Sequence, residues 1–222
     1  MKEQTKKMWR EHGMLLGITS AVILMQMLVG VLLWNRLPET IATHFDFHNE
    51  PNGWSSRPFA VFGMPLLLLG LHWMCILLSG LPGFAKPEAS PKLQRLLLLV
   101  IPAVSLLVTV MIYGYALGAA FNIARIVWVF VGVIFAAVGN YLPKIRRNAF
   151  TGIRLPWTLM DDEVWNRTHR FSGPVWVVGG LLMIVCGLIG TGPAIPVAAI
   201  VGVIAMPMVY SLIVGMKKSK QA

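Results

Sequence analysis

The stretch LLLLVIPAVSLLVTVMIYGYAL occupies residues 96–117 and contains no charged side chain. With a rise of about 1.5 Å per helical residue, a helix over this stretch is about 33 Å long, enough to cross a hydrocarbon core of about 30 Å. Its apolar side chains follow one another without the alternation that a membrane β-strand shows. The stretch therefore predicts a transmembrane helix.

Five further segments have the same character, and they lie at residues 13–34, 59–80, 126–142, 174–190 and 196–216. The whole chain is 56% hydrophobic and 13% charged, with a mean hydropathy of +0.70. A soluble domain would need far more polar surface. The basic start resembles a secretory signal, but the first apolar segment is too long and no cleavage site follows it, so an uncleaved anchor is expected. The sequence predicts an all-α membrane protein with six transmembrane helices.

The basic residues are sorted between the predicted connections. Sixteen of the 19 Lys and Arg residues lie at the two termini and in the second and fourth connections, and the other three are Arg36, Arg57 and Arg125. The positive-inside rule places both termini in the cytoplasm. The formal charge of +10 then faces an anionic leaflet, so it does not require a nucleic-acid partner.

The first connection, residues 35–58, is then external and long enough to be structured. Residues 40–47 have the β-branched and aromatic content of a short strand, and Pro51-Asn52-Gly53 is typical of a tight turn. In one strand, His44, Asp46 and His48 would share a face, which would suit a metal ion. A polar turn with hydrogen-bonding histidines is the alternative. Trp54 is expected to lie at the membrane interface.

The fourth connection, residues 143–173, is cytoplasmic in this topology. Thr158 resembles a helix N-cap, with Asp161 three residues later and further acids near the positive end of the helix dipole. Residues 159–171 place Val164, Trp165, Thr168 and Phe171 on one helical face. A short amphipathic helix at the inner membrane surface is therefore expected.

Other chemistry is weakly indicated. Cys75 and Cys186 both fall inside predicted spans, so a disulfide framework is not expected. His72 is the titratable side chain well inside a span, which would suit either a proton relay or a hydrogen-bonded core position. HExxH, GxSxG and P-loop motifs are missing from the sequence. Gly114 and Gly118 form a GxxxG pattern that would allow close helix packing.

The two connections together resemble a known family. Residues 139–143 read GNYLP, residues 148–159 read NAFTGIRLPWTL, and residues 163–170 read EVWNRTHR. These elements resemble the signature of the SdpI family, and the first connection resembles a small domain of unknown function that often precedes it. The residues that carry the signature are Asn140, Pro143, Asn148, Gly152, Arg154, Pro156, Trp157, Thr158, Trp165, Thr168 and His169.

The resemblance implies a six-helix, non-enzymatic immunity protein in the bacterial cell membrane, without a cofactor or metal. It would protect the cell from a secreted, membrane-active peptide toxin, and it would recruit a small winged-helix repressor to the lipid bilayer without itself touching nucleic acid. In this hypothesis His44, Asp46, His48 and Trp54 meet the toxin, and the signature residues either bind the partner or hold the fold. Residues 1–95 form a two-helix region and residues 96–222 a four-helix region. A small-solute or peptide transporter and a membrane metalloenzyme are the alternatives.

Overall fold

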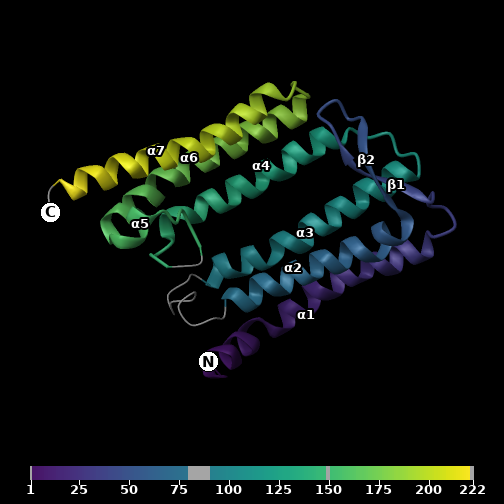
Figure 1. Ribbon diagram of the computed structural model, residues 1–222, viewed down its shortest axis with the longest axis horizontal. Coiled ribbons are helices and arrows are strands. Elements are labelled where there is room, and N and C mark those ends of the chain that lie inside the picture. Colours follow the sequence, from purple (N-terminus) through teal and green to yellow (C-terminus); the bar gives the residue numbers. More distant parts are fainter. Residues whose placement is uncertain (1, 80–90, 149–150, 221–222) are drawn as a thin grey trace. The chain divides into compact units, whose positions relative to one another are not determined.

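The computed structural model describes residues 2–79, 91–148 and 151–220 (Figure 1). The long helices are α1 (Lys2–Leu32), α2 (Met64–Ser79), α3 (Pro91–Ala116), α4 (Ile123–Tyr141), α6 (Asp162–Ile189) and α7 (Ala194–Ser219). The short helical pieces are η1 (Phe59–Gly63), η2 (Leu142–Lys144) and α5 (Pro156–Met160). Strands β1 (Thr40–Phe45) and β2 (Pro51–Ser56) form one antiparallel hairpin in the first connection, where the sequence predicts structure.

Five of the described helical segments are long and apolar enough to cross a membrane, and they are Gly13–Leu32, Leu98–Ala116, Ile123–Lys144, Asp162–Ile189 and Ala194–Ser219. The predicted segment 59–80 contains a shorter apolar helix, Phe59–Cys75, and its last residue lies outside the described residues. The chain is therefore a helical, multi-pass membrane protein, as expected. The count of six spans remains a prediction.

The chain forms two compact units. The first comprises Met1–Pro82 and Gln94–Ala124, and it includes α1, the hairpin, η1, α2 and α3 from Gln94 onward. The second comprises Gly83–Leu93 and Arg125–Ala222, and it includes α4 from Arg125 onward, α5, α6 and α7. The predicted boundary between the two-helix region (1–95) and the four-helix region (96–222) remains a prediction.

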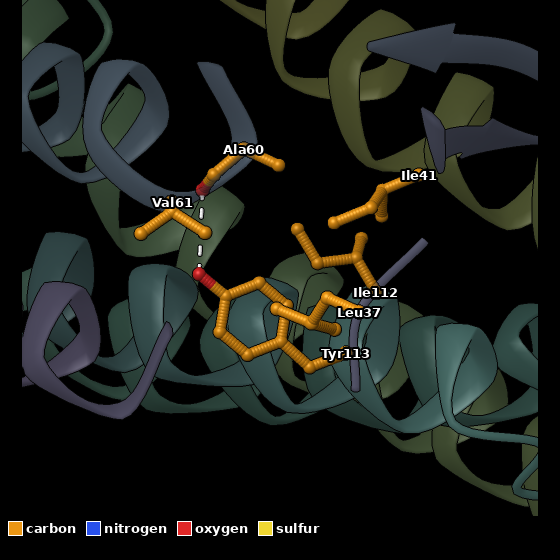
Figure 2. Close-up of a cluster of buried hydrophobic side chains, with 6 residues drawn as sticks. All are labelled: Leu37, Ile41, Ala60, Val61, Ile112 and Tyr113. Atoms are coloured by element: carbon orange, nitrogen blue, oxygen red, sulfur yellow. Dashed lines mark hydrogen bonds between the residues drawn. The ribbon is translucent and has the colours of Figure 1, made fainter. Parts of the chain in front are cut away.

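A buried apolar cluster fixes the hairpin to the helices of the first unit (Figure 2). Its members come from the segment between α1 and β1 and from β1, η1 and α3, and they are Leu37, Ile41, Ala60, Val61, Ile112 and Tyr113. The Tyr113 hydroxyl donates a hydrogen bond of 3.5 Å to the Ala60 carbonyl. Arg57, which follows β2, donates from one guanidinium nitrogen to the carbonyls of Trp34 and Leu37 at 2.8 and 2.9 Å. Burial of the cluster and the hydrogen bonds of Arg57 hold the base of the hairpin.

Polar side chains also join the helices of the first unit. The buried imidazole Nε2 of His72 lies 2.9 Å from the Thr19 hydroxyl oxygen, which links α2 to α1. The Gln26 side-chain oxygen accepts hydrogen bonds of 2.7 Å from Ser105 and Thr109, which link α1 to α3. Such bonds stabilise helix contacts in a membrane, because lipid offers no alternative partner. His72 therefore occupies a hydrogen-bonded position between helices.

Glycines set the approach of α4 to α6 in the second unit. A Cβ atom added at Gly132 would lie 2.5 Å from the carbonyl oxygen of Gly180, and one added at Gly139 would lie 3.0 Å from that of Gly173. Gly132 and Gly139 lie seven residues apart on α4, and Gly173 and Gly180 lie seven residues apart on α6. Each helix therefore presents its two glycines on one face. The interpretation of Gly114 and Gly118 as a packing motif is wrong, since Gly118 lies beyond the end of α3 at φ +87° and has open space around it.

The predicted amphipathic helix over residues 159–171 is also wrong in its bounds. Helix α5 ends at Met160, and α6 begins at Asp162 and continues through Pro174 to Ile189. Thr158 lies inside α5, whereas the Asp161 side chain caps α6. The sequence pattern located the helical face correctly, but Pro174 does not interrupt the helix.

Candidate functional site

The hairpin tip is organised by one carboxylate. Asp46 Oδ1 accepts the backbone N–H groups of His48 and Glu50 at 2.8 and 2.9 Å, and the Asp46 N–H donates to the Glu50 carbonyl at 2.9 Å. The N–H of Glu50, followed by that of His48, holds the pKa of Asp46 below its ordinary value. Asn49 completes the turn at φ +70°, a conformation that asparagine tolerates better than most residues. Asp46 therefore shapes the turn.

The two histidines of the hairpin do not line up with Asp46. Strand β1 ends at Phe45, and its register shifts on both sides of His44, so the expected alternation stops before Asp46. His44 Nδ1 contacts the Asn52 side-chain oxygen, whereas His48 Nδ1 lies 3.7 Å from Asp46 Oδ2. Within the described residues no three His, Cys, Asp or Glu side chains are grouped to hold a metal ion. The prediction of one shared strand face is wrong, and the polar-turn alternative describes the geometry.

The hairpin presents large apolar side chains on its surface. Trp54 on β2 is 59% exposed, and Phe47 in the turn is 58% exposed. Trp54 is paired across the hairpin with Ala42, which is buried. Exposed aromatic groups on a rigid hairpin suit either a membrane interface or a peptide partner.

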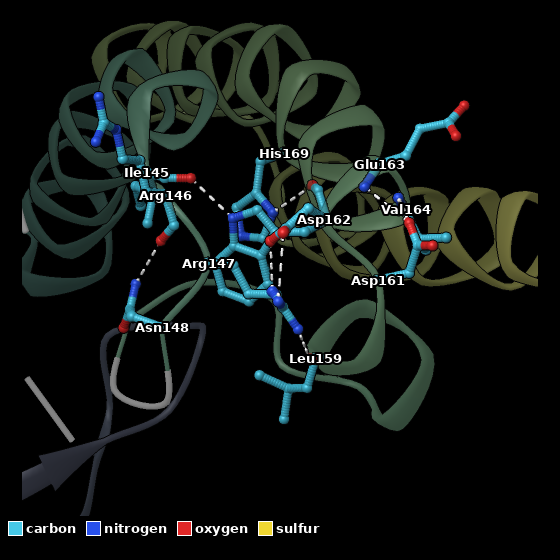
Figure 3. Close-up of polar contacts among 11 residues, drawn as sticks. Ile145, Arg146, Arg147, Asn148, Leu159, Asp161, Asp162, Glu163, Val164 and His169 are labelled. Atoms are coloured by element: carbon cyan, nitrogen blue, oxygen red, sulfur yellow. Dashed lines mark hydrogen bonds and ion pairs between the residues drawn. The ribbon is translucent and has the colours of Figure 1, made fainter. Parts of the chain in front are cut away.

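The signature segment, residues 139–170, is centred on two stacked rings at the start of α6, one of which belongs to His169 (Figure 3). The ring centroids of Trp165 and His169 lie 4.1 Å apart, and both side chains are buried. Trp165 Nε1 donates to the Ile145 carbonyl at 2.8 Å. His169 Nδ1 lies 2.8 Å from the Trp165 carbonyl, and His169 Nε2 accepts the Ile153 N–H at 2.9 Å. Because Nε2 accepts, the proton resides on Nδ1, and a neutral imidazole joins the connection to α6.

Gly152 is required by both its conformation and its surroundings. Its φ of +116° is unfavourable for any residue with a Cβ atom. An added Cβ would also lie 3.0 Å from the Trp165 ring; the His169 Nε2 atom would be still closer, at 2.4 Å. The chain can therefore pass over the stacked rings only at a glycine.

Two further signature residues fold the connection onto itself. The buried Thr158 hydroxyl accepts the Leu155 N–H at 2.9 Å and donates to the Ile153 carbonyl at 2.8 Å. Asn148 accepts the Thr151 N–H at 2.6 Å and donates to the Arg146 carbonyl at 2.8 Å. These contacts pair backbone groups of the connection that lie outside the helices.

Trp157 attaches α5 to α7. Its Nε1 donates to the Ser211 hydroxyl at 3.1 Å, and a Cβ added at Gly215 would lie 3.1 Å from its ring. The rings of Phe171 and Tyr210 stack at 4.2 Å and join α6 to α7 nearby. The connection is thus fastened to two helices of the second unit.

Charged groups close the same end of the second unit. Asp161 Oδ1 accepts the N–H groups of Glu163 and Val164 at 2.8 and 2.9 Å, and the Val164 N–H is the main cause that lowers the pKa of Asp161. Arg147 pairs with both carboxylate oxygens of Asp162, at 2.5 and 3.3 Å (Figure 3). Glu163 pairs with Lys218 near the end of α7. The acids therefore serve as a helix cap and as ion-pair partners.

The remaining signature residues divide by exposure. Pro143 is exposed, although one side of its ring packs against Gly173, where an added Cβ would lie 2.4 Å from the ring. Thr168 is buried, and its hydroxyl has no hydrogen-bond partner within the described residues. Asn140, Arg154 and Pro156 are exposed, and so are Leu159 and Met160 on α5. The exposed group is the part of the segment that a partner could reach.

Sequence reasoning missed the groups that hold these residues. Trp165 and His169 are bound by the carbonyl of Ile145 and the N–H of Ile153, and backbone atoms carry no residue-type signal. Ser211 and Gly215 lie more than fifty residues from Trp157. Asn49 was not singled out either, although its side chain leaves the hairpin and accepts the Ile123 N–H at 2.6 Å.

The fold and these two regions define a multi-pass membrane protein with a structured first loop and an internally bonded signature segment. Residues 144–215 match the SdpI/YfhL protein family, and residues 21–69 match a domain of unknown function, DUF1648. The chain is 28% identical over 168 residues to the immunity protein SdpI of Bacillus subtilis (strain 168), which covers 76% of this chain and 79% of that protein. No solved structure matches the chain. The resemblance to the SdpI family is confirmed.

Proposed function

We propose that this protein is a non-enzymatic immunity protein that protects the cell from a secreted, membrane-active peptide. The observation that carries the proposal is the relative in Bacillus subtilis, which is an immunity protein and aligns over most of both chains. The matches at residues 21–69 and 144–215 support it further, since they contain the whole hairpin and nearly all of the signature segment.

The proposed topology has six spans with both termini in the cytoplasm of a bacterial cell membrane. The distribution of Lys and Arg supports it, with sixteen on one side and three on the other. Arg57, one of those three, is bound to carbonyl groups and lies 4.6 Å from the centroid of the Trp34 ring. In this topology the hairpin faces outward and the signature segment faces the cell interior.

The toxin would meet the hairpin. Trp54 and His48 are exposed on it, and His44 lies at the pairing position opposite Gly53. Asp46 would act indirectly, because its carboxylate holds the turn. A rigid hairpin with exposed aromatic groups loses little conformational entropy on binding a peptide.

The cytoplasmic partner, proposed as a small winged-helix repressor, would meet the exposed part of the signature segment. That part comprises Asn140, Arg154, Pro156, Leu159 and Met160. Trp165, Thr168 and His169 would keep the connection in a defined shape, since they are buried. Most signature residues would thus support the partner site by holding its shape, and few would contact the partner directly.

The SdpI resemblance implies protection from one secreted killing peptide, the sporulation-delaying toxin, and expression in cells that are sensitive to this peptide tests the proposal. The protein should restore growth in the presence of the peptide, and the empty vector should not. A parallel culture that expresses the Bacillus subtilis relative serves as the comparison. The amount of tagged protein in the membrane fraction must match between cultures. Growth no better than that with the empty vector, at matched protein levels, would remove the immunity proposal for this peptide.

A further inference from the structure

The first turn of α4 is bonded on two sides, and each bond reaches a different part of the chain. On one side, Asn49 Oδ1 at the hairpin tip accepts the N–H of Ile123, the first residue of α4, at 2.6 Å. On the other, Arg125 Nε donates to the Gly187 carbonyl at 2.9 Å, and a second guanidinium nitrogen contacts the Leu188 carbonyl. Only Ala124 separates these two bonded residues.

Both bonds satisfy helix ends. The first N–H groups of a helix have no partner within it, so the Asn49 oxygen acts as a cap supplied by the hairpin. The last carbonyl groups of a helix are similarly unpaired and carry partial negative charge, which a guanidinium neutralises. Helix α6 ends at Ile189, and Gly190 follows as its C-cap in the left-handed conformation; a Cβ added at Gly190 would lie 2.9 Å from the Arg125 guanidinium carbon.

The opposite end of α6 carries the stacked Trp165 and His169 and, through His169 Nε2, the Ile153 N–H of the signature connection. The α6 helix is continuous over its 28 residues between these two ends. The far end of α4 leads through η2 to Ile145, whose carbonyl accepts from Trp165. The first turn of α4 is therefore connected to the signature cluster along both helices.

We propose that the first turn of α4 is a coupling element, through which a change at the hairpin tip alters the stability of the signature connection. Release of Asn49 from Ile123 frays the start of α4 and loosens the Arg125 contacts with the end of α6. The disturbance then reaches Trp165 and His169, and the Ile153 hydrogen bond opens more often. This coupling is separate from the immunity function, because it is expected in the protein without any bound toxin.

The carbonyl oxygen of the Asn49 side chain is the group that the proposal requires. Asn49→Gly keeps the positive φ of the turn but removes that oxygen. Asn49→Asp keeps an acceptor at the same place, and aspartate also tolerates this backbone conformation. Thr43→Ala removes the 3.1 Å contact with Ser55 and serves as a control for general loosening of the hairpin.

Hydrogen exchange of the full-length protein in lipid nanodiscs, without any toxin, tests the proposal. Asn49→Gly should speed exchange about fivefold at Ile123, in line with the loss of a helix cap, and at least twofold at Ile153. Asn49→Asp should leave both near the wild-type rates, and Thr43→Ala should affect only hairpin amides. Arg125→Gln should also speed exchange at Ile153, and the double variant should do so no more than the larger single change.

Two results would overturn the coupling. In one, Asn49→Gly speeds exchange at Ile123 and leaves Ile153 unchanged. In the other, Thr43→Ala speeds exchange at Ile153 as much as Asn49→Gly does. Because the measurement uses no peptide, failure of the immunity assay leaves its outcome unaffected, and the two proposals can fail separately.

Discussion

The hairpin and the signature connection use similar residue types in opposite ways. Both contain histidine, tryptophan and an aspartate that accepts two backbone N–H groups. In the hairpin, Trp54 is exposed on the surface. In the signature connection, Trp165 and His169 are buried and bonded to backbone atoms. Residue type alone therefore does not distinguish a recognition surface from a structural cluster, and burial does.

Gly152→Ala should disrupt the signature connection more than any other single change. The added Cβ would overlap His169 Nε2 at a φ of +116°, so we expect the unfolding free energy to fall by about 3 kcal/mol. Thermal unfolding in detergent micelles measures the effect. Gly118→Ala is the matched control, because it has a positive φ and open space, and it should cost about 1 kcal/mol. Equal losses for the two variants would show that Gly152 does not support the rings.

Trp165→Phe should have the next largest effect. It removes the Nε1 donor, leaves the Ile145 carbonyl buried without that bond, and reduces the volume of the stack on His169. A loss of about 2 kcal/mol is expected in the same unfolding measurement. Wild-type stability would contradict a structural role for this tryptophan.

Trp54→Ala tests the other half of the comparison, the exposed surface of the hairpin. Since the indole is 59% exposed, the unfolding free energy should change by less than about 0.5 kcal/mol. Survival in the peptide should fall about tenfold, as expected for the loss of an aromatic anchor at a peptide interface. Unchanged survival at equal membrane levels would remove Trp54 from the proposed toxin site.

The smallest effect concerns acid pH at the hairpin tip. The pKa of Asp46 is lowered from its ordinary value of 3.8, so the stability that its carboxylate contributes is present above that pH and is lost as the pH falls through the lowered pKa. Exchange at the Glu50 amide, corrected for its intrinsic pH dependence, should therefore rise below pH 3.8. Asp46→Asn should remove this pH dependence, and a pH dependence that persists would assign it to another group.

The sequence was sufficient where a property depends on composition over a full helix. The runs around residues 96–117 and 196–216 predicted α3 and α7, because crossing a membrane requires long apolar segments. The quoted signature residues predicted the family resemblance that residues 144–215 confirm.

The sequence was insufficient where the deciding group is a backbone atom or a bulge. The alternation through His44, Asp46 and His48 failed because the register of β1 shifts at His44 and the strand ends at Phe45. Thr158 and Asp161 are both good N-cap residues, and only the structure shows that Asp161 caps α6. The bonds that hold His169 involve carbonyl and N–H groups, which every residue type offers.

Labelling of single cysteines in intact cells tests most directly whether the two regions lie on opposite sides of the membrane. His48→Cys and Asn166→Cys would be introduced singly at these exposed positions, after Cys75 and Cys186 have been replaced by alanine. A membrane-impermeant maleimide should label the cysteine at position 48 in intact cells and that at position 166 only after the membrane is opened. Labelling of position 166 in intact cells, with position 48 protected, would contradict the outward hairpin and the inward signature connection.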